Sequence, residues 1–234
     1  MALNSGIEYV DHSWNPWVGC HPVSDGCRNC YMYREQRRFG QDPTVVRRTG
    51  EATWRQVKKF KTWSTVFVCS WSDFFIEEAD AWRADAWRAM ASRRDVEWVI
   101  VTKRPERIAG RLPWNDKLPW PNVVGMVTAE NQKMADLRVP ILLRASFQFY
   151  GLSVEPMLGP VDITSPTNFL DWVVCGCESG PQRRKTGIDW IRRLRDQCRL
   201  ARIPFFLKQM EVGGRVVKMP ALDGKRWSDT WIPF

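Results

Sequence analysis

Several common features are missing from this chain of 234 residues. It has no apolar run of about 18 residues, the length that a membrane-spanning helix needs. The opening stretch MALNSGIEYVDH has no basic region followed by an apolar run, so it is not typical of a secretory signal. Low-complexity segments and internal repeats are absent too. We therefore expect a cytoplasmic protein without a membrane partner, in which thiols stay reduced.

Histidine is also scarce, since His12 and His21 are the only two, and no general acid–base pair stands out. A hydrophobic content of 44% is ordinary and excludes disordered and collagen-like classes. The length suits one domain spanning residues 1–234. A net charge of +9 favours an anionic partner such as a nucleotide or nucleic acid, and a solvated basic surface is the alternative.

Short apolar runs rich in β-branched and aromatic residues alternate with longer helix-like windows. The predicted strands are Ile7–Val10, Val66–Ser70, Glu97–Thr102, Val123–Thr128, Phe149–Val154, Trp172–Cys177 and Pro204–Lys208. Runs that are apolar on both faces are typical of parallel sheets covered on both sides. This alternation predicts an α/β fold, a single-domain partial (β/α) barrel of about six to seven parallel strands.

The helix-like windows are residues 77–94, 130–145 and 187–202. In the second window a proline interrupts the pattern, so we expect that helix to break or restart near Val139. In the third window, Ile191, Leu194 and Cys198 fall on one stripe and should face the core.

Three of the seven cysteines, Cys20, Cys27 and Cys30, lie within eleven residues in a C-x6-C-x2-C pattern. Glycine precedes the first two of these cysteines, and the HPVSDG segment between them is turn-forming, so residues 14–33 should form a loop. Three thiolates can hold three irons of a [4Fe–4S] cluster and leave the fourth iron open. A structural zinc site with His12, His21 or Cys177 as fourth ligand is the alternative, and unrelated free cysteines are a further one.

Charged or amide residues directly follow each later strand, where the carboxyl ends of parallel strands would bring them to one rim. The segments concerned are CSWSDFF, TKRPER, TAENQ, SVEPMLGP, GCESGP and KQM, in chain order.

These motifs carry a resemblance. The segments WNPWVGCHPVSDGCRNCYMY, SWSDFF, TKRP, SVEPMLGP, WVVCGCESGP and PFFLKQ, in this order, resemble a phage and prophage family of unassigned function. The three-cysteine motif of that family is similar to that of the radical S-adenosylmethionine superfamily, whose common loop is C-x3-C-x2-C. The resemblance implies a [4Fe–4S] cluster, S-adenosylmethionine, an electron donor such as flavodoxin or ferredoxin, and the host cytoplasm as location.

The resemblance also implies roles for individual residues. Cys20, Cys27 and Cys30 would ligate the cluster, whose open iron binds S-adenosylmethionine, so that a 5′-deoxyadenosyl radical can take a hydrogen from the substrate. The residues expected to bind the cofactor are Ser70, Ser72 and Asp73 at its amino group, Lys103 at its carboxylate, Glu130 and Glu155 at the ribose, and Gly176 and Glu178 at the adenine. The residues expected to face substrate are Tyr31, Arg104, Lys208 and Gln209.

Two of these assignments have structural alternatives. Asp73 would instead cap a helix that begins near Glu77, and Glu178 would instead form a buried salt bridge to an arginine. For the whole chain we expect an enzyme acting on a nucleotide, a modified base or nucleic acid, with modification of phage DNA as one example. The alternative is a non-enzymatic, basic nucleic-acid-binding protein with a structural zinc in the three-cysteine loop.

Overall fold

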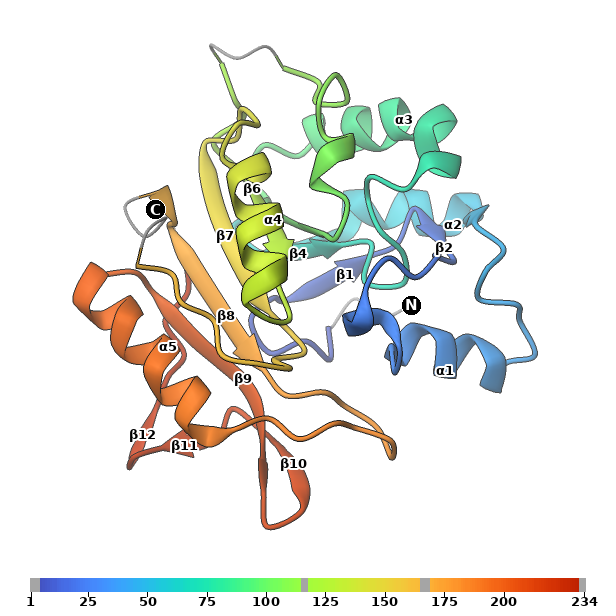
Figure 1. The fold of residues 1–234 in the computed structure, drawn as a ribbon. Helices are drawn as coiled ribbons and strands as arrows, with labels where there is room; N and C mark the ends of the chain where they lie inside the picture. The colour runs from blue at the N-terminus through green and yellow to red at the C-terminus, as the bar shows by residue number, and fades with distance from the viewer. Residues whose placement is uncertain (1–4, 115–117, 165–168, 232–234) are drawn as a thin grey trace.

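A curled, mostly parallel sheet in the form of a half-barrel organises the chain (Figure 1). The computed structural model describes residues 5–114, 118–164 and 169–231. In spatial order the strands of the main sheet are β1 (His12–Trp14), β4 (Thr65–Val68), β5 (Glu97–Thr102), β6 (Val123–Thr128), β7 (Phe149–Val154), β8 (Trp172–Gly176), β9 (Phe205–Val212) and β10 (Arg215–Lys218).

Neighbouring strands from β1 to β9 run parallel, and β10 folds back antiparallel on β9. The chain is thus a mixed α/β domain, as the alternation of strands and helices predicts. Two small antiparallel sheets add the pairs β2 (Trp17–Val18) with β3 (Arg47–Arg48) and β11 (Ala221–Leu222) with β12 (Lys225–Arg226).

Helices follow several of the strands, and α3, α4 and α5 lie along the outside of the sheet (Figure 1). The helices are α1 (Tyr31–Arg38), α2 (Glu51–Trp54), α3 (Asp80–Ala91), α4 (Gln132–Leu142) and α5 (Ile188–Ala201), with 3-10 turns η1 (Asp25–Cys27), η2 (Arg55–Lys59), η3 (Glu77–Ala79) and η4 (Pro105–Arg107). Within the described residues, no helix is long and apolar enough to cross a membrane. The predicted stripe of Ile191, Leu194 and Cys198 is buried, which confirms the core face of α5.

Both faces of the sheet are packed, because successive side chains of a strand point to opposite sides. All six residues of β6 are buried: Val123 packs in the outer core beneath the helices, and Val124 packs in the inner core on the concave side. Large rings fill that concave side, including Trp172 and Phe206. The fully buried strands therefore confirm the prediction of a sheet covered on both faces.

Two local predictions are wrong. Residues 7–10 form a turn instead of the first strand, since Tyr9 and Val10 use their apolar side chains to pack into the concave core, and β1 begins at His12. Helix α4 does not break near Val139 but runs through Pro140 to Leu142. Pro140 lies in the last turn and is exposed, so water can satisfy the carbonyl that its missing N–H leaves unpaired.

Candidate functional site

A cavity of about 150 Å³ lies at the carboxyl ends of the parallel strands. It brings together eleven of the fifteen residues that the sequence predicts for the site: Cys20, Cys27, Cys30, Tyr31, Ser70, Ser72, Asp73, Lys103, Arg104, Glu155 and Lys208. These residues come from five separate parts of the chain: the cysteine loop with the start of α1, the segments that follow β4, β5 and β7, and the middle of β9. The predicted residues that do not line it are Glu130, Gly176, Glu178 and Gln209.

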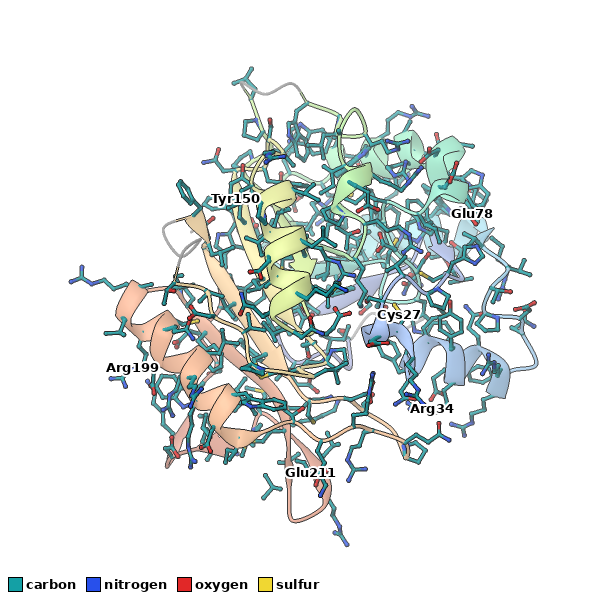
Figure 2. The ribbon with its side chains drawn as sticks, viewed as in Figure 1. Cys27, Arg34, Glu78, Tyr150, Arg199 and Glu211 are labelled. Atoms are coloured by element: carbon teal, nitrogen blue, oxygen red, sulfur yellow. The ribbon has the colours of Figure 1, made fainter. Side chains whose placement is uncertain are left out.

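The cysteine loop leaves the small strand β2, turns through η1 and enters α1, so the three thiols have three different backbone settings. Cys20 follows β2, Cys27 ends η1, and Cys30 immediately precedes the first residue of α1. All three are partly buried free thiols, and Cys27 lies beside the amino end of α1 (Figure 2). The local turn is held by main-chain bonds from Cys27 N to Ser24 O (2.9 Å) and from Cys30 N to Cys27 O (3.2 Å).

Gly19 is required where the loop begins. Its φ of +93° is disfavoured for a residue with a side chain, and a Cβ atom there would lie 2.2 Å from the main-chain oxygen of Val45. Since Cys20 N donates to Pro43 O (2.9 Å), this close approach to the 43–46 segment sets the position of the first cysteine.

A buried ion pair holds the middle of the loop from the side of α4. Glu130 is 0% exposed, its Oε1 accepts from the Gly26 main-chain N–H (3.1 Å), and its Oε2 pairs with Arg138 (2.9 Å). Burial alone would raise the pKa of the Glu130 carboxyl, but the hydrogen bonds it accepts and the charge of Arg138 lower that pKa, so the carboxylate is charged. Glu130 therefore anchors the residue next to Cys27, a role that the sequence pattern does not suggest.

A second carboxylate holds the loop from the segment after β8. Glu178 accepts from Asn29 Nδ2 (2.9 Å) and forms a salt bridge with Arg184 (2.5 Å), and Arg184 in turn donates to the Asp25 carbonyl (2.8 Å). The structural alternative for Glu178, a buried salt bridge to an arginine, is the arrangement observed. Sequence reasoning missed Asn29, Arg138 and Arg184. Asn29 lies 149 residues from Glu178 along the chain. Arg138 and Arg184 lie only eight and six residues from their carboxylate partners, but no recognised spacing marks these pairs.

The side of the loop at Cys20 is held by a cation. Arg104 lies 3.6 Å from the Cys20 sulfur, donates to the His21 carbonyl (2.7 Å), and pairs with Asp73 (3.3 Å). Burial raises the pKa of the Cys20 thiol to about 11, although the Arg104 charge opposes the rise. Tyr33 also donates to the Cys20 carbonyl. Arg104 is thus the group that favours a thiolate or another anion at this sulfur.

Polar residues at the end of β4 are largely engaged with the protein itself. Ser72 donates to the Gly19 carbonyl (2.6 Å), and the Ser70 hydroxyl bonds to Asn15 Nδ2 (3.1 Å). Asp73 accepts from Thr102 Oγ1 (2.7 Å) and from the Lys103 N–H (2.9 Å). It does not cap the following helix, because η3 is preceded by Ile76 and α3 by Ala79 without a side-chain cap.

These contacts hold the cysteine loop at the edge of the cavity. One comparison with known protein families covers nearly the whole chain. A family profile described as "Protein of unknown function (DUF5131)" matches residues 4–230. The chain belongs to this DUF5131 family. A search of curated proteins found no match, and a search of solved structures found none either.

On the far wall of the cavity in this DUF5131 protein, Glu155 and Lys208 form an ion pair of 3.0 Å. Gly176 makes room for it, because a Cβ atom there would lie 2.6 Å from Glu155 Oε1. Gln209 instead donates to the Cys177 carbonyl (2.7 Å) and does not line the cavity. Tyr31 donates to the Ser70 carbonyl, and burial raises the pKa of its phenol well above the usual value.

The two metal groups that the sequence suggests, a zinc ion and a [4Fe–4S] cluster, need different arrangements of side chains. Among residues 5–114, 118–164 and 169–231, no three His, Cys, Asp or Glu side chains form a group that could hold a metal ion. A [4Fe–4S] cluster makes a different demand, because each cysteine binds a separate iron and all three need only face one space. The three cysteines line one cavity and Arg104 lies beside one of them, which fits the cluster. At about 150 Å³ the cavity is smaller than typical ligand clefts of roughly 300–1,000 Å³, so a ligand as large as S-adenosylmethionine would fit only after lining side chains moved.

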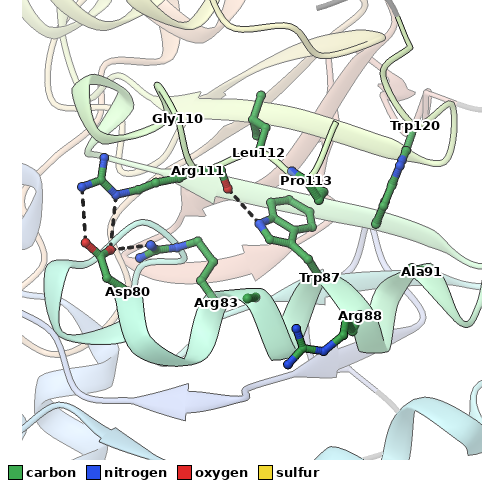
Figure 3. A pocket seen from close by; sticks show the side chains of 11 residues that line it. Asp80, Arg83, Trp87, Arg88, Ala91, Gly110, Arg111, Leu112, Pro113 and Trp120 are labelled. Carbon is green, nitrogen blue, oxygen red and sulfur yellow. Dashed lines mark hydrogen bonds and ion pairs between the residues drawn. The ribbon is translucent and has the colours of Figure 1, made fainter. Parts of the chain in front are cut away.

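A larger hollow of about 640 Å³ lies elsewhere, between α3 on one side and residues 110–113 and Trp120 on the other (Figure 3). Charged side chains that line it form ion pairs with one another: Asp80 pairs with both Arg83 and Arg111. Trp87 donates its indole N–H to the Arg111 carbonyl (2.9 Å). None of the residues predicted for the site lines this hollow, so size alone does not mark the functional site.

Proposed function

We propose that this protein is a [4Fe–4S]-dependent radical S-adenosylmethionine enzyme built on a partial (β/α) barrel. The observation that carries the proposal is the cavity that all three cysteines of the loop line together with charged side chains from the ends of β4, β5 and β7 and from β9. Fold alone does not define an activity, whereas a set of soft ligands gathered with charged groups at the carboxyl ends of parallel strands has a specific chemical use.

In this proposal Cys20, Cys27 and Cys30 hold the cluster, and the loop supplies no fourth cysteine. The bound cluster would supply the electron that splits the sulfonium of S-adenosylmethionine. The chain itself fixes the three thiols by the contacts of Gly19, Glu130 and Glu178 described above. Because these contacts come from three directions, the loop is ordered before any group binds, which lowers the entropy lost on binding.

The cavity also offers charged groups for the amino acid part of the cofactor. Lys103 and Lys208 are cations suited to a carboxylate or a phosphate, and Glu155 is an acceptor for an ammonium or for ribose hydroxyls. Arg104 neutralises negative charge at Cys20 and at whatever it binds. The net charge of +9 supports a nucleotide, a modified base or nucleic acid as substrate class.

The first test is anaerobic reconstitution with iron and sulfide. The wild-type protein should become brown, with broad absorption near 400 nm, about the region where thiolate-bound [4Fe–4S] clusters absorb. Cys27→Ala should lose this absorption, whereas Cys198→Ala, which alters a buried cysteine of α5, should keep it. A colourless protein that binds one zinc would support the alternative of a zinc-containing nucleic-acid-binding protein.

The second test follows the reaction. Dithionite replaces the flavodoxin or ferredoxin that we propose as electron donor, and 5′-deoxyadenosine released from S-adenosylmethionine is measured by chromatography. We expect release by the reconstituted wild type and none by Cys27→Ala. A protein with a full complement of cluster that releases none would refute the radical assignment while leaving the cluster in place.

A further inference from the structure

A third cavity, of about 290 Å³, lies at the end of the sheet opposite the cysteine cavity. Thr65, Glu97 and Trp172, which line it, are the first residues of β4, β5 and β8. The cysteine cavity lies where these parallel strands end, so the two cavities occupy opposite ends of the half-barrel. This volume is near the lower end of ligand clefts, roughly 300–1,000 Å³, and therefore suits a small molecule.

Glu97 is the unusual group in this cavity. It is 3% exposed, and both of its carboxylate oxygens lack a hydrogen-bond partner among the described residues. Glu97 lies two residues before Val99, which packs in the concave core, so both side chains point to the same, concave side. Burial raises the pKa of the Glu97 carboxyl to about 7, because nothing nearby compensates for the lost water.

Other carboxylates share the cavity. Glu8 pairs through one oxygen with Lys218 (2.5 Å), and its other oxygen has no partner within the described part of the chain. Asp11 accepts from the Thr65 main-chain N–H (2.8 Å). Within the described part of the chain, the lining includes three carboxylates and no lysine, arginine or histidine, although the whole chain carries a net charge of +9. The cavity is thus a negatively charged site on a basic protein.

Aromatic rings complete the lining. Tyr9 and Trp172 meet edge to face with centroids 5.4 Å apart, and Trp231 is buried beside them. Trp63 is 65% exposed and contributes an accessible indole. The faces of such rings attract cations, and their surfaces also accept a short alkyl chain.

We propose that this cavity binds a small primary alkylammonium ion. Its N–H groups would donate to the unpartnered oxygens of Glu97, and its alkyl chain would lie against the rings of Trp172 and Trp231. A metal ion fits less well, because the described residues hold no group of three ligands for one. A quaternary ammonium fits less well too, because it has no N–H to donate. This inference does not depend on the proposed radical chemistry.

The test is calorimetric titration of the full chain at pH 8 with n-butylammonium chloride as the probe. Butan-1-ol has the same alkyl chain without the charge, and potassium chloride controls for ionic strength. We expect the ammonium to bind at least about tenfold more tightly than the alcohol, because it makes charge-assisted hydrogen bonds. Equal affinity for the two compounds, or no binding of the ammonium, would overturn the inference.

Variants identify the group responsible. Glu97→Gln keeps the shape of the side chain and should weaken ammonium binding about tenfold. Glu77→Gln changes an acid whose side chain is 82% exposed, outside the cavity, and should leave binding unchanged. Unchanged binding by Glu97→Gln would overturn the inference. Circular dichroism shows whether the Glu97→Gln variant is folded. If it is not, the comparison of n-butylammonium with butan-1-ol on the wild-type protein still tests the inference.

Discussion

Glu130 is a buried carboxylate, and the two roles considered for it predict different effects when it is substituted. The sequence resemblance suggests that it binds the ribose of the cofactor, whereas in the structure it pairs with Arg138 (2.9 Å) and accepts from the Gly26 N–H (3.1 Å). We predict that Glu130→Gln, which keeps the shape and removes the charge, loosens the cysteine loop. The amount of the proposed [4Fe–4S] cluster that the protein retains, and not only its affinity for the proposed cofactor, should therefore decrease.

The magnitude follows from burial. Glu130 is 0% exposed, and the side chain of Arg138 is 4% exposed, so the substitution leaves a buried guanidinium without its counter-ion. Removing one partner of such a pair costs about 3–5 kcal/mol of unfolding free energy. Arg138 keeps its bond to the Thr128 carbonyl (2.8 Å) and glutamine keeps an acceptor, so we expect about 2–3 kcal/mol. For a chain of this size this lowers the melting temperature by about 4–12 °C.

The assay combines urea unfolding with iron content after anaerobic gel filtration. Glu106→Gln is the matched control, because Glu106 is exposed on the neighbouring segment after β5. The double variant Glu130→Gln with Arg138→Met should recover part of the stability, since no unpaired charge remains. If Glu130→Gln lost less than about 0.5 kcal/mol, the ordinary range for surface changes, and kept its iron, the anchoring role would be refuted.

Three further predictions concern other parts of the molecule. In the ligand-free protein, burial raises the pKa of Glu97 from 4.5 to about 7. Between these two pH values the folded state therefore keeps a proton that the unfolded state has lost. The free energy of unfolding should fall as the pH rises from 4.5 to about 7 and level off above that. After allowance for screening by water, Glu97→Gln should remove about 1–2 kcal/mol of this fall in urea titrations, and an unchanged slope would contradict it. Gly19→Ala should lower the melting temperature more than Gly40→Ala, because both have positive φ but only Gly19 meets a main-chain oxygen, at 2.2 Å; equal losses would exclude the clash. Arg184→Ala should reduce iron retention, whereas Arg199→Ala, at a side chain that is 64% exposed, should not; equal retention would show that the salt bridge to Glu178 is dispensable.

The sequence predicted the central strands of the main sheet more accurately than the turn at residues 7–10 and the edge strand β10. The observed bounds of β5, β6 and β7 are those predicted, because each run is short and rich in β-branched and other apolar residues. The run at residues 7–10 was misread because a buried turn and a buried strand share the same composition. The additional strand β10 carries exposed residues and gave no apolar signal.

The functional site, like the fold, could be predicted only in part. The cysteines and the polar residues that end the strands could be predicted, since parallel strands bring their carboxyl ends to one rim. The partners of Glu130 and Glu178 could not, because an ion pair or a hydrogen bond to a distant main-chain group leaves no periodic trace in the sequence. Each acid lies two residues after the end of a strand, which is why its position suggested a ligand contact, and the structure shows each bonded to the loop.

The separation in sequence between the cysteine loop and its anchors has a consequence for biosynthesis. The loop is among the first segments to leave the ribosome, yet the groups that position it, Glu130, Glu178 and Arg184, are translated 104 to 159 residues later than their partners. A nascent chain therefore exposes three unpositioned thiols for most of its synthesis. Loading of the proposed cluster would therefore come after residue 184 has emerged, when all the groups that hold the loop are present.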